Sequence, residues 1–133
     1  MTTATKTRLS TAPVMPVLPA VDIERAKSFY GETLGLEIEE RAEMPGYFTV
    51  HAGSGSSILV YQRERTKAEH TVAGFLVQEI ESVVRELRER GVVFEEYDLP
   101  GMKTVGGIAD LGPGGKSAWF TDSEGNIVAI SEM

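Results

Sequence analysis

Cysteine is absent from the 133 residues of the chain. Its absence excludes disulfides, zinc–thiolate sites, iron–sulfur clusters and thiol nucleophiles. Because reduced, disulfide-free chains are typical of the cytosol, the sequence favours a cytoplasmic protein. Long apolar runs are also missing, since no stretch approaches the roughly 18–20 residues of a membrane span. We therefore expect no membrane partner.

Positive charge is scarce, with 13 lysine and arginine residues against 20 aspartate and glutamate residues and a net charge of −7. An acidic surface repels phosphate backbones and anionic lipid, so nucleic acid is not an expected partner. Histidine is scarce as well. His51 and His70 are the only two, which restricts imidazole-based metal binding and acid–base chemistry to these positions.

What the sequence does contain is one order of elements that occurs twice. Residues 14–21 predict a strand, a helix begins at Asp22 and ends before Gly35, and strands follow at 36–40, 47–52 and 57–62. The order restarts with a strand at 71–77, a helix from Ile80 to Gly91, and strands at 92–97, 116–121 and 127–131. The predicted fold class is therefore α+β, built from two βαβββ modules.

The predicted organisation follows from these repeats. Residues 1–13, rich in serine and threonine and without an apolar segment, are expected to form a disordered tail. We expect a first module at 14–62, a polar connector at 63–70 and a second module at 71–133. Together, residues 14–133 are predicted to make one domain.

Two segments resemble the vicinal oxygen chelate superfamily, which includes glyoxalase I, bleomycin and fosfomycin resistance proteins, and extradiol dioxygenases. They are the run from Val21 to Gly35, with the sequence VDIERAKSFYGETLG, and the run from Ala118 to Asn126, with the sequence AWFTDSEGN. The resemblance covers residues 15–133 and implies the glyoxalase/bleomycin resistance fold. In that fold the modules form an open, curled mixed sheet whose concave side holds a ligand. It also implies a homodimer, with the modules paired within one chain or exchanged between two.

The resemblance further implies four positions for ligands of a divalent metal, usually His, Glu or Gln. These positions hold Met15, Leu59, Val72 and Ala129. Hydrocarbon and thioether groups do not bind hard divalent ions, so we expect a metal-free member of the superfamily without a cofactor. A displaced site built from His51 and His70 with Glu69 or Glu132 is the alternative.

Strand alternation predicts which side chains line the concave side. Phe48, Val50, Ala118 and Phe120 are expected to face the helices. The expected lining is apolar and aromatic, as is typical of a pocket for a small organic molecule, unless these side chains fill the space themselves. It consists of Met15, Val17, Tyr47, Thr49, His51, Leu59, Tyr61, Val72, Leu76, Trp119, Ile127 and Ala129.

The glycine-rich segment 100–115 is longer than a hairpin loop requires. Its apolar residues Met102, Val105 and Ile108 are candidates for a lid over the pocket, and a dimer contact explains them equally well.

Three functions remain open from the sequence. The favoured one is a binder of a small apolar or aromatic molecule, similar to the bleomycin resistance branch. The second is an enzyme of the same superfamily, a lyase, isomerase or dioxygenase. It would be metal-free, with His51 and Tyr61 or Tyr47 as acid and base, or would use a displaced metal. The third is an interaction module whose cleft has no ligand. The sequence assigns no catalytic residue.

Overall fold

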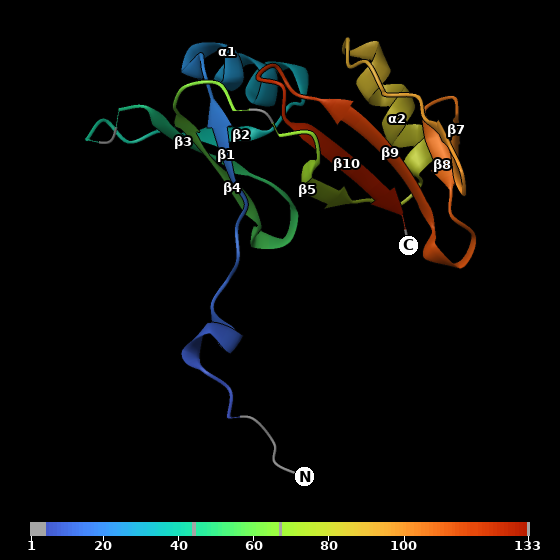
Figure 1. Ribbon diagram of the computed structural model, residues 1–133. Coiled ribbons are helices and arrows are strands. Elements are labelled where there is room, and N and C mark those ends of the chain that lie inside the picture. Colours follow the sequence, from blue (N-terminus) through green and yellow to red (C-terminus); the bar gives the residue numbers. More distant parts are fainter. Residues whose placement is uncertain (1–4, 44, 67, 133) are drawn as a thin grey trace.

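The computed structural model describes residues 5–43, 45–66 and 68–132. The chain forms two sheets, and a helix covers one face of each (Figure 1). The elements of the first half are β1 (Val17–Ala20), α1 (Ile23–Ser28), η2 (Phe29–Thr33), β2 (Glu37–Glu39), β3 (Tyr47–His51), η3 (Gly53–Gly55) and β4 (Ser57–Gln62). Those of the second half are β5 (Thr71–Leu76), α2 (Ile80–Glu89), β6 (Asp98–Leu99), β7 (Met102–Val105), β8 (Ile108–Asp110), η4 (Gly112–Gly114), β9 (Lys116–Thr121) and β10 (Ile127–Glu132).

The two sheets repeat one topology. Sheet A has the order β1-β4-β3-β2 and sheet B the order β5-β10-β9-β8-β7-β6. In each, the first strand pairs in parallel with the last, and the other pairs are antiparallel. This is the predicted α+β arrangement of two βαβββ modules. The predicted connector, 63–70, lies between the end of β4 and the start of β5.

Different groups begin the two helices. At α1 the Asp22 carboxylate accepts a hydrogen bond from the backbone N–H of Arg25 at 3.0 Å, as the sequence predicted. At α2 the preceding Glu79 has a left-handed φ of 54° and makes no side-chain cap. There the carboxylate of Glu132, from the last strand, accepts from the N–H of Ile80 at 2.8 Å. The sequence did not indicate this long-range cap.

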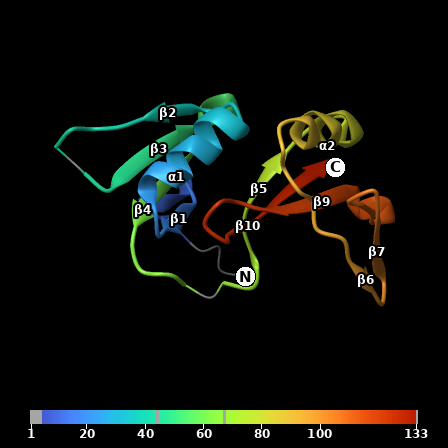
Figure 2. The same cartoon turned by 90° about the horizontal axis from the view of Figure 1, so that it is seen from above.

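Each module has its own apolar core between helix and sheet, and the two cores join. Phe29 and Leu34, which follow α1, pack against both cores, as does Phe75 of β5. The rings of Phe29 and Phe120 lie 6.3 Å apart. The modules therefore contact one another through side chains that both cores share, while α1 and α2 lie over separate halves of the molecule (Figure 2).

A five-residue turn, Asp122–Asn126, fastens the second module to the first. The Asp122 carboxylate accepts from the hydroxyl of Tyr30 at 2.6 Å, and Asn126 donates to the carbonyl of Pro19 at 3.0 Å. Glu124 accepts from the backbone N–H groups of Val21 and Asp22 at 2.9 and 2.8 Å. We call Asp122–Asn126 the latch turn.

The latch turn explains why the two most recognisable sequence segments occur together. The guanidinium of Arg25 in α1 donates to Glu124 through Nε at 2.6 Å and Nη2 at 3.1 Å. Charge-assisted, bidentate contacts of this kind are among the stronger hydrogen bonds in proteins. The first segment thus supplies the donors and the second the acceptors of one contact between modules.

The structure corrects the prediction for 92–115. Residues 92–97 do not form a regular strand, and their one bridge joins Phe94 to Phe120. The glycine-rich segment contains strands β7 and β8 rather than a long loop. Gly106 and Gly107 both have positive φ and form the tight turn between β7 and β8. The turn requires positive φ at both positions, and residues other than glycine rarely adopt that conformation, which explains the two glycines.

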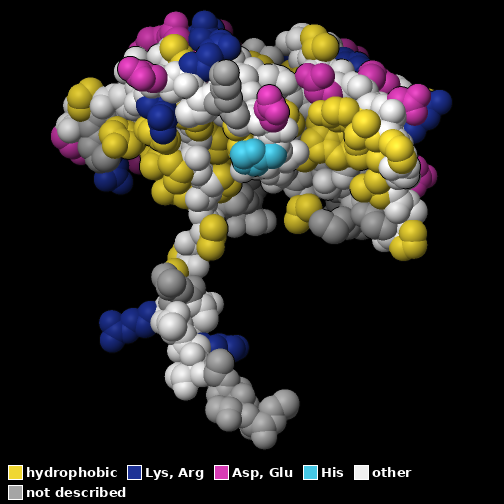
Figure 3. Space-filling view, viewed as in Figure 1, with side chains coloured by type: hydrophobic (Ala, Val, Ile, Leu, Met, Phe, Trp, Pro, Cys, Tyr) yellow, Lys and Arg dark blue, Asp and Glu magenta, His cyan; other side chains and the backbone are white. Residues whose placement is uncertain are grey.

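Residues 5–13 precede the first module. The side chains described in this segment are exposed, and it carries one 3-10 turn, η1 (Arg8–Thr11). The segment projects away from the sheets and shows basic but no acidic side chains (Figure 3). Whether it is disordered stays a prediction. Within the described ranges, no helix has the length and apolar character needed to cross a membrane.

Candidate functional site

Each sheet has a second face that carries no helix, which we call its open face. In sheet A, Phe48 and Val50 are buried against the helix, and Tyr47, Thr49 and His51 point the other way. The strand register extends this face into rows. One row joins Val17, Leu59, Thr49 and Glu39, and another joins Tyr61 and Tyr47.

Sheet B has the same alternation. Ala118 and Phe120 are buried in the core, and Trp119 lies on the open face beside Ala129. Ile127 lies opposite Thr121, and Leu76 pairs with Ser131. Val72 is partly buried and packs against the core of the first module. The predicted lining therefore divides into seven residues on sheet A and four on sheet B, with Val72 between the modules.

The open faces are exposed to solvent to an unusual degree for apolar surface. Leu76 is 76% exposed, Val17 53% and Tyr47 42%. Apolar side chains reach the surface on both halves of the molecule (Figure 3). Large apolar side chains this exposed, on sheet faces that no helix covers, make both open faces candidates for a binding surface.

On sheet A the open face contains a cavity of about 250 Å³. Beside it the Nε2 atom of His51 lies 2.8 Å from an oxygen of Glu39. The hydrogen bond to His51, together with its charge, lowers the pKa of the Glu39 carboxyl. The cavity is lined by Met15, Glu39, Arg41, Tyr47, Phe48, Thr49 and Leu59.

The predicted acid–base pair of His51 and Tyr61 is not formed. His51 lies opposite Ser57, and Tyr61 is four residues further along the same strand. At about 3.3 Å per residue, this separation is roughly 13 Å. The Tyr61 hydroxyl instead accepts a hydrogen bond from Arg63 at 3.5 Å. The partner of His51 is Glu39, which sequence reasoning missed.

On sheet B the open face presents an aromatic pair. The rings of Tyr97 and Trp119 meet edge to face, with centroids 5.5 Å apart and planes at 85°. The backbone N–H of Glu95 donates to the carbonyl of Trp119 at 2.8 Å, and its carboxylate accepts from the Thr121 hydroxyl at 3.0 Å. Tyr97 and Glu95 were not predicted as site residues. The sequence signal for them was their alternation with the apolar Val92 and Phe94, which are buried and leave Glu95 and Tyr97 for the opposite face.

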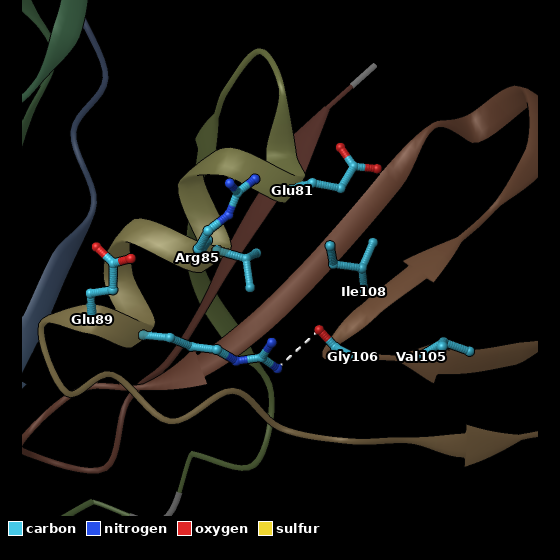
Figure 4. Close-up of a pocket in the computed structure, with 8 residues that line it drawn as sticks. Glu81, Arg85, Glu89, Val105, Gly106 and Ile108 are labelled. Atoms are coloured by element: carbon cyan, nitrogen blue, oxygen red, sulfur yellow. Dashed lines mark hydrogen bonds between the residues drawn. The ribbon is translucent and has the colours of Figure 1, made fainter.

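Two of the three lid candidates lie on the other side of sheet B. Val105 and Ile108 face α2, where they line a groove of about 570 Å³ with Arg85 and Glu89 (Figure 4). In this groove the guanidinium of Arg88 donates to the carbonyl of Gly106 at 2.9 Å. Because Val105 pairs with Ile108 and Ile108 with the buried Ala118, these side chains cannot cover Trp119. Met102 lies three positions before Val105 on the same strand, so its side chain points to the opposite face of sheet B. It is partly buried.

The residues at the four family metal positions do not fit a divalent metal. Leu59, Val72 and Ala129 offer hydrocarbon, and the Met15 sulfur lies 3.7 Å from the Ser57 hydroxyl. In the part of the chain that the structure describes, no three His, Asp or Glu side chains cluster as a metal site requires. Of the displaced-site candidates, Glu132 caps α2.

Comparison with known proteins gives one family. The family model described as Glyoxalase/Bleomycin resistance protein/Dioxygenase superfamily matches residues 12–130. None of the curated proteins matches the chain.

Several solved structures share the fold. TnmS3, an antibiotic binding protein from Streptomyces sp. CB03234, is 19% identical, with coverage of 92% of this chain and 97% of that one and a TM-score of 0.67. The oxidase ChaP-H2 is 24% identical, with coverage of 92% and 94% and a TM-score of 0.68. The fosfomycin resistance protein FosX from Listeria monocytogenes is 14% identical, with coverage of 92% and 91% and a TM-score of 0.65. With its family match and this fold, the chain belongs to the Glyoxalase/Bleomycin resistance protein/Dioxygenase superfamily.

Proposed function

We propose that this protein binds a small apolar or aromatic molecule on the open face of sheet B. The observation that carries the proposal is the edge-to-face pair of Tyr97 and Trp119, both only partly buried. Aromatic rings with one free face provide a large contact area for a flat ligand at a low entropic cost. TnmS3, which has the same fold, is an antibiotic binding protein, and FosX is a fosfomycin resistance protein.

A second copy of the chain supplies the other wall of the site in this proposal. Sheets A and B share no strand, so each open face is the surface of a separate sheet. Both faces expose apolar side chains, among them Val17 and Leu76. Pairing the open face of sheet A with that of sheet B from another copy would cover both and form an enclosed cleft.

Tryptophan emission tests the binding site directly. Trp119 is the only tryptophan, so every change in emission reports on the open face of sheet B. We expect compounds that raise the melting temperature to change this emission as well. The Tyr97→Ala variant should bind them at least tenfold more weakly, whereas Val105→Ala, on the opposite side of the sheet, should bind normally. If no compound in a broad aromatic library changes emission or melting temperature, the proposed function is contradicted.

Sedimentation measurements test whether a second copy of the chain supplies the other wall of the site. The proposal predicts a mass twice that of the 14.5 kDa chain. Val17→Asp places a charge on the open face of sheet A and should give a monomer that binds ligand weakly. Val105→Asp should remain a dimer, since Val105 lies on the helix side. A monomeric wild-type protein with full ligand affinity would disprove the dimer while leaving the site on sheet B intact.

The contact between His51 and Glu39 favours one second candidate function, proton transfer on a bound molecule. A carboxylate bonded to one imidazole nitrogen orients the ring and leaves its other nitrogen to act as acid or base. If a bound compound is converted by the protein, His51→Ala should abolish turnover and leave the dissociation constant unchanged. Turnover that survives this substitution would exclude His51 as the catalytic group.

A further inference from the structure

A carboxylate lies beside the aromatic pair. The antiparallel bridge between Phe94 and Phe120 places Glu95 opposite Trp119. Residues directly opposite on such strands have Cβ atoms about 4.5–5.5 Å apart and point to the same face. Tyr97, two residues further on, returns to that face and its ring contacts Trp119. The Glu95 carboxylate and the two rings therefore share one open surface.

Among the described residues, no lysine or arginine forms an ion pair with the acidic side chains of this segment. Glu95 accepts a hydrogen bond from Thr121, and Glu96 accepts one from Thr104. The carboxylates of Glu95, Glu96 and Asp98 form no ion pair with any described residue. Lys103 lies across from Asp98 in the β6–β7 register, yet no ion pair joins them. Of these three acidic residues, Glu95 is the one that shares the face of the rings, so the negative potential at Trp119 comes mainly from its carboxylate.

Two carboxylates elsewhere on the molecule show what a paired acidic group looks like. Glu124 pairs with Arg25 at 2.6 Å, and Glu81 pairs with Lys116 at 2.7 Å. The faces of aromatic rings carry negative charge from their π electrons and attract cations. At Trp119 the ring faces and the unpaired carboxylate act in the same direction, which favours a positively charged ligand and disfavours an anion.

We propose that the ligand of the Tyr97–Trp119 surface carries an organic ammonium group, bound over the rings and against the carboxylate of Glu95. This inference rests on the proposed function, because it specifies the class of molecule that the same site binds. The apolar part of the ligand lies along the open face of sheet B. The charged nitrogen replaces the cation that Glu95 lacks in the free protein.

Two probes of the same shape and different charge test the inference. Phenyltrimethylammonium and tert-butylbenzene differ in one atom and in charge, and benzenesulfonate supplies the anionic case. Each is titrated against the full-length protein, with Trp119 emission and calorimetry as the readouts. We expect the cation to bind about tenfold more tightly than the neutral probe, since a cation over an aromatic face adds about that factor. The sulfonate should bind more weakly than either.

Glu95→Gln keeps the shape of the side chain and removes its charge. In this variant the affinity for the cation should fall to that for the neutral probe, and the affinity for the neutral probe should not change. Glu89→Gln, on α2 at the helix side of sheet B, should behave as the wild type. Circular dichroism and the melting temperature show whether each variant is folded. If Glu95→Gln does not fold, added salt supplies the second measurement, because it should weaken binding of the cation alone.

The outcomes separate the two proposals. Preference for the cation that is lost in Glu95→Gln, or screened by salt, supports the inference. Equal binding of cation and neutral probe with no effect of Glu95→Gln overturns the charge requirement, while the aromatic site stands. If none of the probes binds and no library compound changes Trp119 emission, both proposals fail.

Discussion

Glu124 in the latch turn offers the sharpest test of how the two modules hold together. Its side chain is 1% exposed and accepts hydrogen bonds from Arg25 and from the N–H groups of Val21 and Asp22. Burial raises the pKa of the carboxyl, but the hydrogen bonds from Arg25, Asp22 and Ser123 and the charge of Arg25 outweigh it. Together they lower the pKa of Glu124 from 4.5 to about 2.

A lowered pKa in the folded state means that folding favours the ionised form. Each unit of pKa difference corresponds to about 1.4 kcal/mol, so the shift corresponds to about 3 kcal/mol of stability at pH 7. Because Arg25 is half exposed and partly screened by water, we expect about 2 kcal/mol of this to be measurable. This stability is fully present above pH 4.5 and is lost as the pH falls from about 4.5 to about 2.

The substitution Glu124→Gln removes the charge and keeps the size of the side chain. Urea unfolding followed by circular dichroism, at one protein concentration, should show a free energy of unfolding about 2 kcal/mol lower than wild type at pH 7. The difference should shrink at pH 4 and fall to about a quarter of its pH 7 value at pH 2.5. Glu89→Gln, whose carboxylate makes no ion pair with the described residues, should change little at any pH. A loss that is the same at pH 7 and pH 2.5 would refute the linkage argument.

Three further predictions concern the core, a turn and metal binding. Tyr30→Phe deletes the buried hydroxyl that donates to Asp122 and should lower the free energy of unfolding by about 1–2 kcal/mol in urea titrations; an unchanged value would show that the bond is not needed. Gly107→Ala places a Cβ 3.0 Å from that of Phe94, whereas Gly106→Ala meets nothing within 4 Å. Both positions have positive φ, so the melting temperature of Gly107→Ala should fall further, and equal losses would exclude the steric cause. Dialysis against a chelator should leave the melting temperature unchanged, and a fall of several degrees would reveal a structural metal.

The sequence was sufficient for the fold because its signals were local. Proline cannot donate to a strand ladder, so Pro16 and Pro19 are typical of an edge strand, and β1 is an edge of sheet A. Asp22 indicated a helix start and caps α1. Strict alternation around Phe48 and Phe120 placed Tyr47 and Trp119 on the opposite faces of their strands, as the structure has them. Periodicity alone carries this information, since side chains alternate along a strand.

The candidate site was predicted less completely because its key contacts are long-range. Glu95 and Tyr97 contact Trp119 although more than twenty positions separate them in the sequence. The antiparallel bridge that brings them together cannot be predicted from a periodic pattern. Glycine misled the prediction for 100–115, because the positive φ that suits a mobile loop also suits the hairpin turn at Gly106. Nor does alternation reveal how two sheets are placed relative to each other. The division of the predicted lining between sheets A and B therefore required the structure.

The latch turn has no counterpart at the other end of the contact between modules. There the equivalent turn, Gly53–Gly55, offers no carboxylate and borders a hollow of about 380 Å³ next to Gly74 and Leu76. Among the described residues, the hydrogen bonds that join the modules involve the latch turn, apart from a 3.5 Å contact between Arg90 and a carbonyl. The polar attachment of the two modules is therefore one-sided, and away from the latch turn the contact between them depends on the apolar side chains of Phe29, Leu34 and Phe75.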